Sequence, residues 1–269
     1  MSGIVNPTPA SVMKAIRLLA EGTDDEDGIG ELIAVDVGGA TTDVYTICDG
    51  RPTKANTVFK GLPEPYAKRT VEGDIGMRYS IHGIVDAAGI GRVSELSGLK
   101  PGKCEEMIDF LAEHTDRVPE DEAFEKLDFA LASLAIDAAV DRHAGKLSEV
   151  YTVMGMSFLQ NGKDLSGVKR IVVTGGSLIH TKRTDEIAAH ALYQATSPMS
   201  LRPMSSEVLV DRKYILAAMG LLSEHYPETA LHIMKNNLES LGTVRSAVSK
   251  AEAVDSKFVP MEGPTCHGF

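Results

Sequence analysis

Short hydrophobic runs separated by glycine-containing turns dominate the first sixty residues of the chain. Runs at 31–37, 43–48 and 53–59 have the length of buried strands, and Gly-Gly and Asp-Gly pairs stand between them. Adjacent strands with such short connections form antiparallel meanders. The pattern therefore predicts three neighbouring antiparallel strands, which follow an amphipathic helix from Thr8 to Gly22.

Helical periodicity dominates the centre of the chain. Apolar residues from Leu127 to Ala138 recur at the spacing of one helix face, which predicts a long amphipathic helix over 120–144. Residues 60–118 are predicted to form a helical insert, whose first helix begins near Thr70.

The second half of the chain alternates between strand-like and helix-like segments. A buried strand over 168–174 stops at a Gly-Gly pair, and the less regular segment 147–168 is expected to hold a short helix. We further predict a helix over 183–194, a strand over 208–210, helices over 212–224 and 226–241, and a partly mobile tail that ends at Phe269.

Without the insert, the predicted order of elements is β-β-β-α-β-α-β-α. Three antiparallel strands followed by two helix-connected strands give a mixed five-stranded sheet with helices on its faces, an α/β fold of the ribonuclease-H-like kind. We expect residues 1–269 to form a single domain that contains the insert 60–118 as a subdomain.

Composition excludes several classes of function. The net charge of −11 argues against a nucleic-acid partner or an anionic membrane surface, because both require a positive field. No apolar stretch is long enough to cross a membrane. The cysteines Cys48, Cys104 and Cys266 are widely spaced and odd in number, so we expect a reducing cytoplasm rather than a disulfide framework.

The turn between the first two predicted strands combines glycines with acidic and hydroxyl side chains. Paired glycines allow a phosphate to approach main-chain N–H groups, while a carboxylate can position a metal ion or its bound water. An ordinary β-hairpin is the alternative for such a turn taken alone. The candidate residues are Asp36, Gly38, Gly39, Thr41, Thr42 and Asp43.

A second buried strand also ends on paired glycines, at Gly175, Gly176 and Ser177. Ligands collect at the carboxyl ends of strands in open α/β sheets, where an adenine or ribose could lie against these glycines. Alone, this sequence could be only a tight connection to the next helix. The two turns together predict a nucleotide-binding site, and we expect both to open onto one cleft.

Two further groups of residues keep alternatives open. Gly73 and Asp74 of the insert, with Glu72, either approach the nucleotide or cap the start of a helix. Arg142 and His143 end the long helix, where positive charge also interacts favourably with the helix dipole without any ligand.

The first turn resembles a motif of the sugar kinase, heat-shock chaperone and actin superfamily of ATPases. The motif Asp-x-Gly-Gly-x-Thr-x-Asp is present over 36–43 without a mismatch, and the superfamily's Gly-Gly-Ser adenosine motif is present over 175–177. The resemblance implies ATP or ADP and Mg²⁺ as cofactors. It also implies that Asp36 orients a magnesium-linked water, with phosphate at Gly38, Gly39 and Thr41 and adenosine at the second turn.

Within that superfamily the chain is most similar to the glutamate mutase accessory proteins of the MutL/GlmL type. The segments 35–44, 69–78 and 141–145 carry the likeness, which extends over about 4–240. The resemblance implies an accessory ATPase that activates, repairs or chaperones an adenosylcobalamin-dependent mutase such as glutamate (methylaspartate) mutase. The subunits of that mutase are the partners it implies.

The chain departs from the superfamily pattern in one respect. These ATPases hold the triphosphate between two lobes, and the Asp-x-Gly turn of the first lobe is absent before Asp36. The chain therefore resembles the second lobe alone, for which we expect nucleotide binding, self-association and little hydrolysis, with the first lobe as a missing partner. The alternatives are a small-molecule kinase of the same superfamily and a non-catalytic interaction module.

Overall fold

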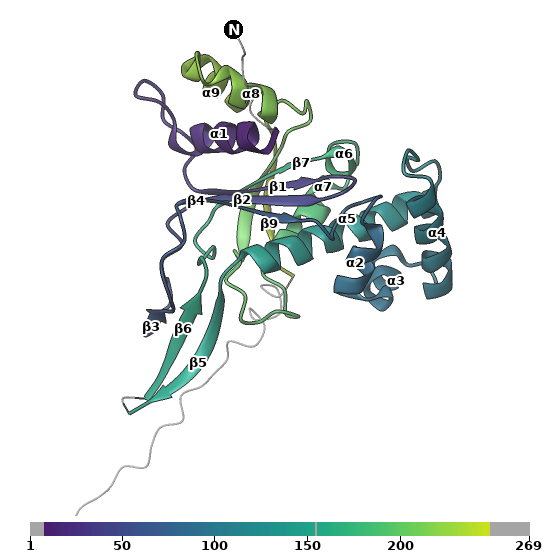
Figure 1. Cartoon of the computed structure of the whole chain (residues 1–269), viewed down its shortest axis with the longest axis horizontal. Coiled ribbons are helices and arrows are strands. Elements are labelled where there is room, and N and C mark those ends of the chain that lie inside the picture. Colours follow the sequence, from purple (N-terminus) through teal and green to yellow (C-terminus); the bar gives the residue numbers. More distant parts are fainter. Residues whose placement is uncertain (1–7, 154, 248–269) are drawn as a thin grey trace, which may run out of the picture.

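The computed structural model describes residues 8–153 and 155–247, which form an α/β fold with two sheets (Figure 1). The helices are α1 (Thr8–Glu21), α2 (Ile81–Ala88), α3 (Ile90–Ser97), α4 (Pro101–Glu113), α5 (Glu122–His143), α6 (Gly176–Ile179), α7 (Thr184–Ala188), the 3₁₀ helix η1 (Ala189–Ala191), α8 (Leu216–Leu222) and α9 (Pro227–Asn237). The strands are β1 (Leu32–Val37), β2 (Thr42–Ile47), β3 (Thr57–Phe59), β4 (Ala67–Glu72), β5 (Lys146–Thr152), β6 (Gly155–Asn161), β7 (Arg170–Thr174), β8 (Ser205–Val210) and β9 (Glu239–Arg245).

The main sheet is mixed and has six strands in the order β4-β2-β1-β7-β8-β9. β1 lies near its centre, antiparallel to β2 and parallel to β7, and β7 is in turn parallel to β8. Strands that are buried on both faces require a continuous hydrophobic sequence. β1 and β7 meet this requirement, which explains their central positions.

Helices cover both faces of the main sheet (Figure 1). One face carries α1, α8 and α9, and the other face carries α5, α6 and α7. Helices α1 and α8 approach so closely that a Cβ atom on Gly220 would lie 1.7 Å from the carbonyl oxygen of Ser11. Only glycine fits at that contact, which fixes how α8 packs on α1.

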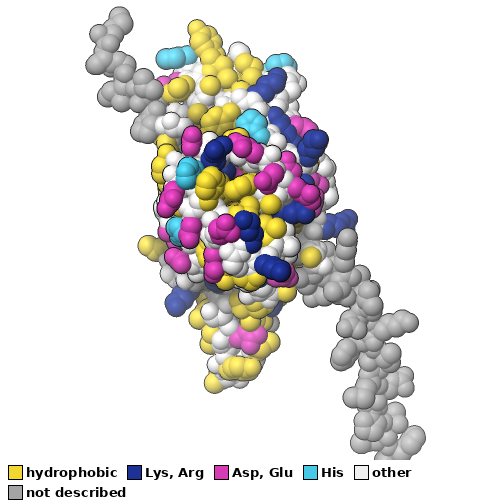
Figure 2. Space-filling view, turned by 90° about the vertical axis from the view of Figure 1, so that its right-hand side faces the viewer, with side chains coloured by type: hydrophobic (Ala, Val, Ile, Leu, Met, Phe, Trp, Pro, Cys, Tyr) yellow, Lys and Arg dark blue, Asp and Glu magenta, His cyan; other side chains and the backbone are white. Residues whose placement is uncertain are grey.

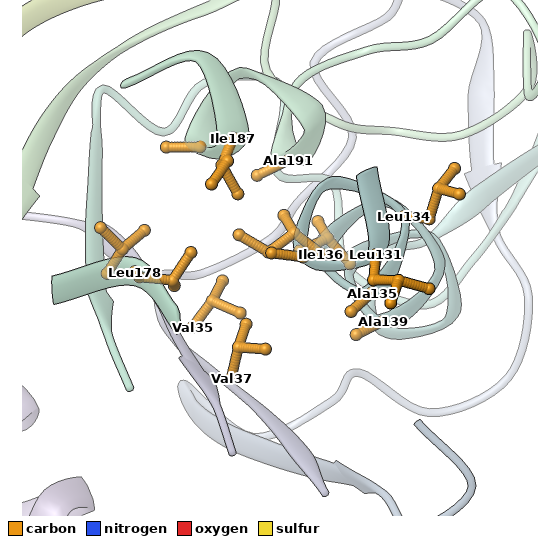
Figure 3. Close-up of a cluster of buried hydrophobic side chains, with 14 of the residues drawn as sticks. Val35, Val37, Leu131, Leu134, Ala135, Ile136, Ala139, Leu178, Ile187 and Ala191 are labelled. Atoms are coloured by element: carbon orange, nitrogen blue, oxygen red, sulfur yellow. The ribbon is translucent and has the colours of Figure 1, made fainter. Parts of the chain in front are cut away.

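The larger hydrophobic core lies between β1 and α5 (Figure 3). Val35 and Val37 of β1 point toward α5, and Leu178 of α6 lies beside them. Helix α5 is buried along most of its length because α2 and α3 pack against it from outside the sheet. A helix that is enclosed in this way has apolar residues around its whole circumference rather than along one stripe.

The helical segment α2–α4 and the small sheet β3-β6-β5 extend from opposite ends of the main sheet (Figure 1). On the face that Figure 2 shows, acidic and basic side chains are intermingled, and no continuous basic area is visible among the coloured residues. Within 8–153 and 155–247, no helix is both long and apolar enough to cross a membrane.

The predicted meander and the start of the insert are wrong in part. Residues 57–59 form β3, which belongs to the small sheet. The strand that pairs with β2, and so completes the meander, is β4 at residues 67–72. Thr70 therefore lies in a strand and not at the start of a helix, and the first helix of the insert begins at Ile81. The segment 67–72 alternates between half-buried and exposed residues, as expected for an edge strand that is solvated on one face.

Further differences concern strands in mixed sequence. The short helix expected within 147–168 is wrong, because this segment contains β5 and β6. The main sheet has six strands rather than five, since helix α9 ends at Asn237 and β9 follows it at the edge. The sequences of β5, β6 and β9 mix polar and apolar residues. Such a pattern is compatible with an edge strand and with a helix.

The remaining predicted elements are confirmed with different bounds. Helices α1 and α5 and strands β1, β2, β7 and β8 occur where the hydrophobic pattern places them. The helix predicted over 183–194 is α7 followed by η1, and the helix predicted over 212–224 is α8. The tail from 248 to Phe269 lies outside the described residues.

Candidate functional site

A row of polar side chains crosses the main sheet where its parallel strands end. Asp36 of β1 is in register with Asp43 of β2 on one side and with Thr174 of β7 on the other. β7 pairs with β8 as far as Val210, so Asp211 is the next residue in the row. Side chains alternate between the two faces of a strand, which places this row on the face that carries α1 and α8.

The two glycine turns meet at this edge of the sheet. Gly175 has a φ of 102°, and a Cβ atom there would lie 2.3 Å from the carbonyl oxygen of Val37. In the first turn, the N–H of Gly38 donates to the carbonyl of Thr41 over 2.9 Å, and a Cβ atom on Gly38 would lie 2.9 Å from that oxygen. The backbone itself therefore requires glycine at 38 and 175.

Gly39 and Gly176 differ from these two glycines because no protein contact requires them. A Cβ atom on Gly39 would meet only Tyr79, 3.8 Å away, and one on Gly176 would meet nothing within 4 Å. Both residues are exposed, and Ser177 beside them is half-buried. The backbone at these positions is open to a ligand from outside.

Asp36 has an unusual electrostatic environment. Its Oδ1 atom is buried and has no hydrogen-bond partner among the residues that the structure describes. Burial, together with the charges of Asp43 and Asp211, raises the pKa of its carboxyl group to about 6. A buried carboxylate oxygen without a partner, close to two other carboxylates, is typical of a site that binds a cation or exchanges a proton.

The side chains of Asp43 and Thr42 point to opposite faces of the sheet. The Asp43 carboxylate accepts hydrogen bonds from the Thr41 hydroxyl over 3.3 Å and from Nε of Arg69 over 2.8 Å. Thr42 is completely buried, and within 8–153 and 155–247 its hydroxyl has no hydrogen-bond partner. Because Thr42 points to the opposite face of β2 from Asp43, its side chain does not join the row.

The block 69–78 holds the first glycine turn in place. The N–H of Met77 donates to the carbonyl of Gly38 over 3.0 Å, and a Cβ atom on Gly76 would lie 2.4 Å from the carbonyl carbon of Ala40. Sequence reasoning did not identify Gly76. The block that contains Gly76 has many charged residues and no hydrophobic run. A glycine in such a block was the one sign in the sequence of a close backbone contact.

Asp74 and Glu72 form ion pairs with Arg142 at the end of α5. The distances from Arg142 Nη1 to the two carboxylates are each 2.8 Å, and this contact lowers the pKa of Asp74. The helix-cap alternative for the two acids is wrong, because Glu72 ends β4 and no helix starts there. Gly73 between them accepts a hydrogen bond from the Ser80 hydroxyl. The ion pairs fasten the block 69–78 to α5.

His143 is a buried structural residue. Its ring nitrogens lie 2.9 Å from the Thr46 hydroxyl and 2.8 Å from the Thr70 hydroxyl. Burial, together with the charges of Lys68 and Lys163, lowers the pKa of His143 to about 3. His143 is therefore neutral at physiological pH and does not supply positive charge to the end of α5, contrary to the dipole alternative.

Arg212 supports the second glycine turn and was not identified from the sequence. Its Nη1 atom donates to the carbonyls of Leu178, Ile179 and Thr181, at distances between 2.7 and 3.3 Å. These carbonyls lie at the end of α6, so Arg212 ties the turn after β8 to the helix that starts at Gly176. A charged residue just after a buried strand was the only indication in the sequence.

The donor set at Asp36 fits a magnesium ion that arrives with a phosphate. Among the residues that the structure describes, no three His, Cys, Asp or Glu side chains converge on a metal position. Mg²⁺ commonly uses one or two carboxylates, with waters and substrate phosphates as its other ligands. Phosphate alone would be repelled by Asp36, Asp43 and Asp211, whereas a cation would offset that repulsion.

Comparison with known proteins identifies relatives over most of the chain. A family model described as "MutL protein" matches residues 1–238. Protein MutL of Clostridium tetanomorphum is 47% identical over 238 residues, which make up 88% of this chain and 52% of the relative. The chain thus spans about half the length of the curated relative it matches.

Proposed function

The chain belongs to the MutL protein family, and we propose that it is the ATP-binding lobe of an accessory protein for a cobalamin-dependent mutase. The nucleotide part of this proposal comes from the two glycine turns and the acidic row. The proposed partner, a mutase such as glutamate (methylaspartate) mutase, is inferred from the family resemblance.

One observation carries the nucleotide part of the proposal. Asp36 and Thr174 are register partners, and the turns that follow them touch at Gly175 and Val37. A single ligand can therefore contact both turns. The alternative for each turn, a simple tight connection, does not explain why Gly39 and Gly176 lack side chains at positions with room for them.

Each part of the site has its own role in this proposal. Asp36 would hold a magnesium ion, and the backbone at Gly38, Gly39 and Thr41 would hold phosphate. The backbone from Gly175 to Ser177 contacts the adenosine. Bound magnesium supplies a positive charge that offsets the phosphate charge, while this chain's own residues orient the ligand.

The strand order supports assignment of the fold to the actin-like ATPase group. Five neighbouring strands, β4-β2-β1-β7-β8, have three antiparallel members followed by two parallel ones, which is the ribonuclease-H-like arrangement. We assign β9 as an addition at the edge. On this assignment the chain is one lobe with the helical segment α2–α4 as its insert.

A second lobe is the proposed partner in turnover. Phosphoryl transfer requires hydrogen-bond donors and positive charge on every side of the transferred group, whereas the proposed site offers one side only. We therefore expect binding of Mg-ADP or Mg-ATP by this chain, hydrolysis near background, and self-association through the uncovered side of the site.

Calorimetric titration of this chain with Mg-ADP, Mg-ATP and adenosine tests the proposed function. We expect measurable binding of all three, and loss of Mg-ADP binding in Gly39→Val because its side chain occupies the phosphate position. Gly102→Val is the matched control, since Gly102 also has open space around its Cβ position but lies on α4. Unchanged Mg-ADP binding by Gly39→Val would place the phosphate site elsewhere.

A further inference from the structure

A hydrophobic groove lies between the end of α4 and the start of α5, outside the main sheet. It has a volume of about 110 Å³, and its apolar walls are the side chains of Phe110, Leu111, Val118 and Phe124. We call this feature the α4–α5 groove. Val118 is 68% exposed and Phe110 is 36% exposed, so two of the four apolar walls face solvent. Exposed apolar side chains that converge on one hollow are typical of an interaction site, whereas single exposed ones are not.

The walls of the α4–α5 groove are held in place without an occupant. The ring centroids of Phe110 and Phe124 lie 5.9 Å apart. The Asp121 carboxylate accepts a hydrogen bond from the N–H of Phe124 over 3.0 Å, which caps the start of α5. Nε of Arg78 donates to the carbonyl of Arg117 over 3.1 Å and so anchors the loop between the two helices. A partner would therefore meet a preformed surface and would lose little entropy in ordering it.

The surface around the groove is strongly acidic. Residues 101–126 contain nine acidic and three basic side chains, hence a net charge of −6, compared with −11 for the whole chain. All nine acidic residues are exposed, and each of the three basic side chains forms an ion pair with one of them. Glu120 and Asp121 line the groove itself. Figure 2 looks onto this end of the molecule and shows hydrophobic side chains with charged ones around them. The excess negative charge is left for a partner to offset.

We propose that the α4–α5 groove binds a basic amphipathic segment of a partner protein. An apolar side chain of that segment fills the groove, and lysine or arginine residues that flank it at helical spacing lie against the acidic surface. A purely apolar segment would leave the carboxylates without compensating charge, and a nucleic acid would be repelled by them. The inference concerns a protein partner and does not depend on nucleotide binding.

Fluorescence anisotropy with two labelled peptides tests the proposal. One peptide has leucine at helical spacing and lysine at the other positions, and the second peptide replaces every lysine with glutamate. We expect the lysine peptide to bind the chain at physiological salt, and the glutamate peptide to bind about tenfold or more weakly. Equal affinities of the two peptides, or no binding of the lysine peptide, would overturn the inference.

A variant of the exposed valine tests the apolar part of the contact. Val118→Ser removes apolar surface from the groove, and the fold should tolerate the change because Val118 is exposed. We expect it to weaken binding of the lysine peptide about fivefold or more. Val58→Ser is the matched control, since Val58 is 59% exposed on the small sheet and its replacement should change the affinity less than about twofold. Equal affinities of Val118→Ser and the unmodified chain would overturn the inference.

A double charge reversal tests the acidic part of the contact. Glu120 lines the groove, and Glu125 lies one turn beyond Asp121 on α5. We expect Glu120→Lys combined with Glu125→Lys to weaken binding of the lysine peptide about tenfold or more. Asp24→Lys combined with Asp25→Lys is the matched control, because it changes the net charge equally in an exposed loop after α1. Equal losses in the two double variants would reveal only a general attraction to an acidic protein, and would overturn the inference.

Sedimentation velocity distinguishes the proposed partner from a second copy of this chain. We expect Val118→Ser to self-associate as the unmodified chain does. Loss of self-association in this variant would assign the α4–α5 groove to a second copy and overturn the inference. Mg-ADP affinity of Val118→Ser should equal that of the unmodified chain, so failure of the proposed nucleotide function and failure of this inference are separate results.

Discussion

Asp36 and Thr174 are cross-strand partners at the ends of two parallel strands, although they lie far apart in the sequence. Neither Asp36 Oδ1 nor the Thr174 hydroxyl has a hydrogen-bond partner within the described part of the chain. Buried polar groups without partners lower the stability of a fold. Both groups lie between the two glycine turns, where the proposed ligand would supply the missing partners.

Asp36→Asn should stabilise the protein at neutral and alkaline pH. The folded-state pKa of about 6 lies above the ordinary value of 3.8, so the folded state binds a proton more tightly than the unfolded state. Stability of the unmodified chain therefore falls as pH rises from about 4 to 6, and the loss is complete above pH 6. Asn removes this loss, which corresponds to roughly 2–3 kcal/mol at pH 8.

Urea denaturation of the two proteins at pH 4 and pH 8 measures this difference. Asp49→Asn serves as the control, because Asp49 is exposed and lies outside the row. A stability difference between Asp36→Asn and the unmodified chain that is the same at both pH values would contradict the prediction.

Asp36→Ala should separate the two halves of the nucleotide site. Because the proposed adenosine contacts come from the second glycine turn, adenosine affinity should stay within about twofold of that of the unmodified chain. Mg-ADP affinity should fall about tenfold or more, since the group that holds the magnesium water is lost. Calorimetry with both ligands checks this, and parallel losses of the two affinities would argue against the assigned role of Asp36.

Gly175→Ala should destabilise the fold, whereas Gly176→Ala should not. The Cβ atom at 175 would collide with the carbonyl of Val37, and φ at 175 is 102°, so we expect a loss of about 2 kcal/mol or more. At 176 nothing lies within 4 Å, and the change should be within about 0.5 kcal/mol. Chemical denaturation of this neighbouring pair gives a direct comparison, and equal losses would show that the turns do not touch.

His143 should make the fold sensitive to acid. Its folded-state pKa of about 3 lies below the ordinary 6.5, so the unfolded state binds more protons between these values. Stability from this residue is complete above pH 6.5 and is lost as pH falls toward 3. The NMR signal of the His143 ring should show a neutral imidazole at pH 5. A normal titration of His143 would contradict its burial between Thr46 and Thr70.

The two turns could be predicted because each has two local signals in the sequence. Each follows a continuous hydrophobic run, 32–37 or 170–174, that only a central buried strand can use, and each has paired glycines directly after the run. The prediction that both turns open onto one cleft requires them to lie at the same edge of the sheet. The parallel register of β1 and β7 places the two turns at one edge.

The edge strands could not be predicted in the same way. β4, β5, β6 and β9 have mixed composition, because one or both of their faces are partly solvated. For such segments the pairing partner selects the conformation, and local propensity contributes little. Thr70 illustrates this: its hydroxyl contacts His143 on a helix distant in the sequence, and no local pattern encodes that contact.

The sequence by itself determined the central strands, the long helix α5 and the positions of both glycine turns, because burial and backbone geometry dictate residue type locally. Tertiary structure alone decided which side chains act together. The pKa of Asp36 depends on its burial and on the charges of Asp43 and Asp211, and the Asp74 carboxylate forms an ion pair with Arg142. These relationships arise from charges and contacts between strands that meet only in the folded sheet, and electrostatic interactions depend on distance in space rather than along the chain.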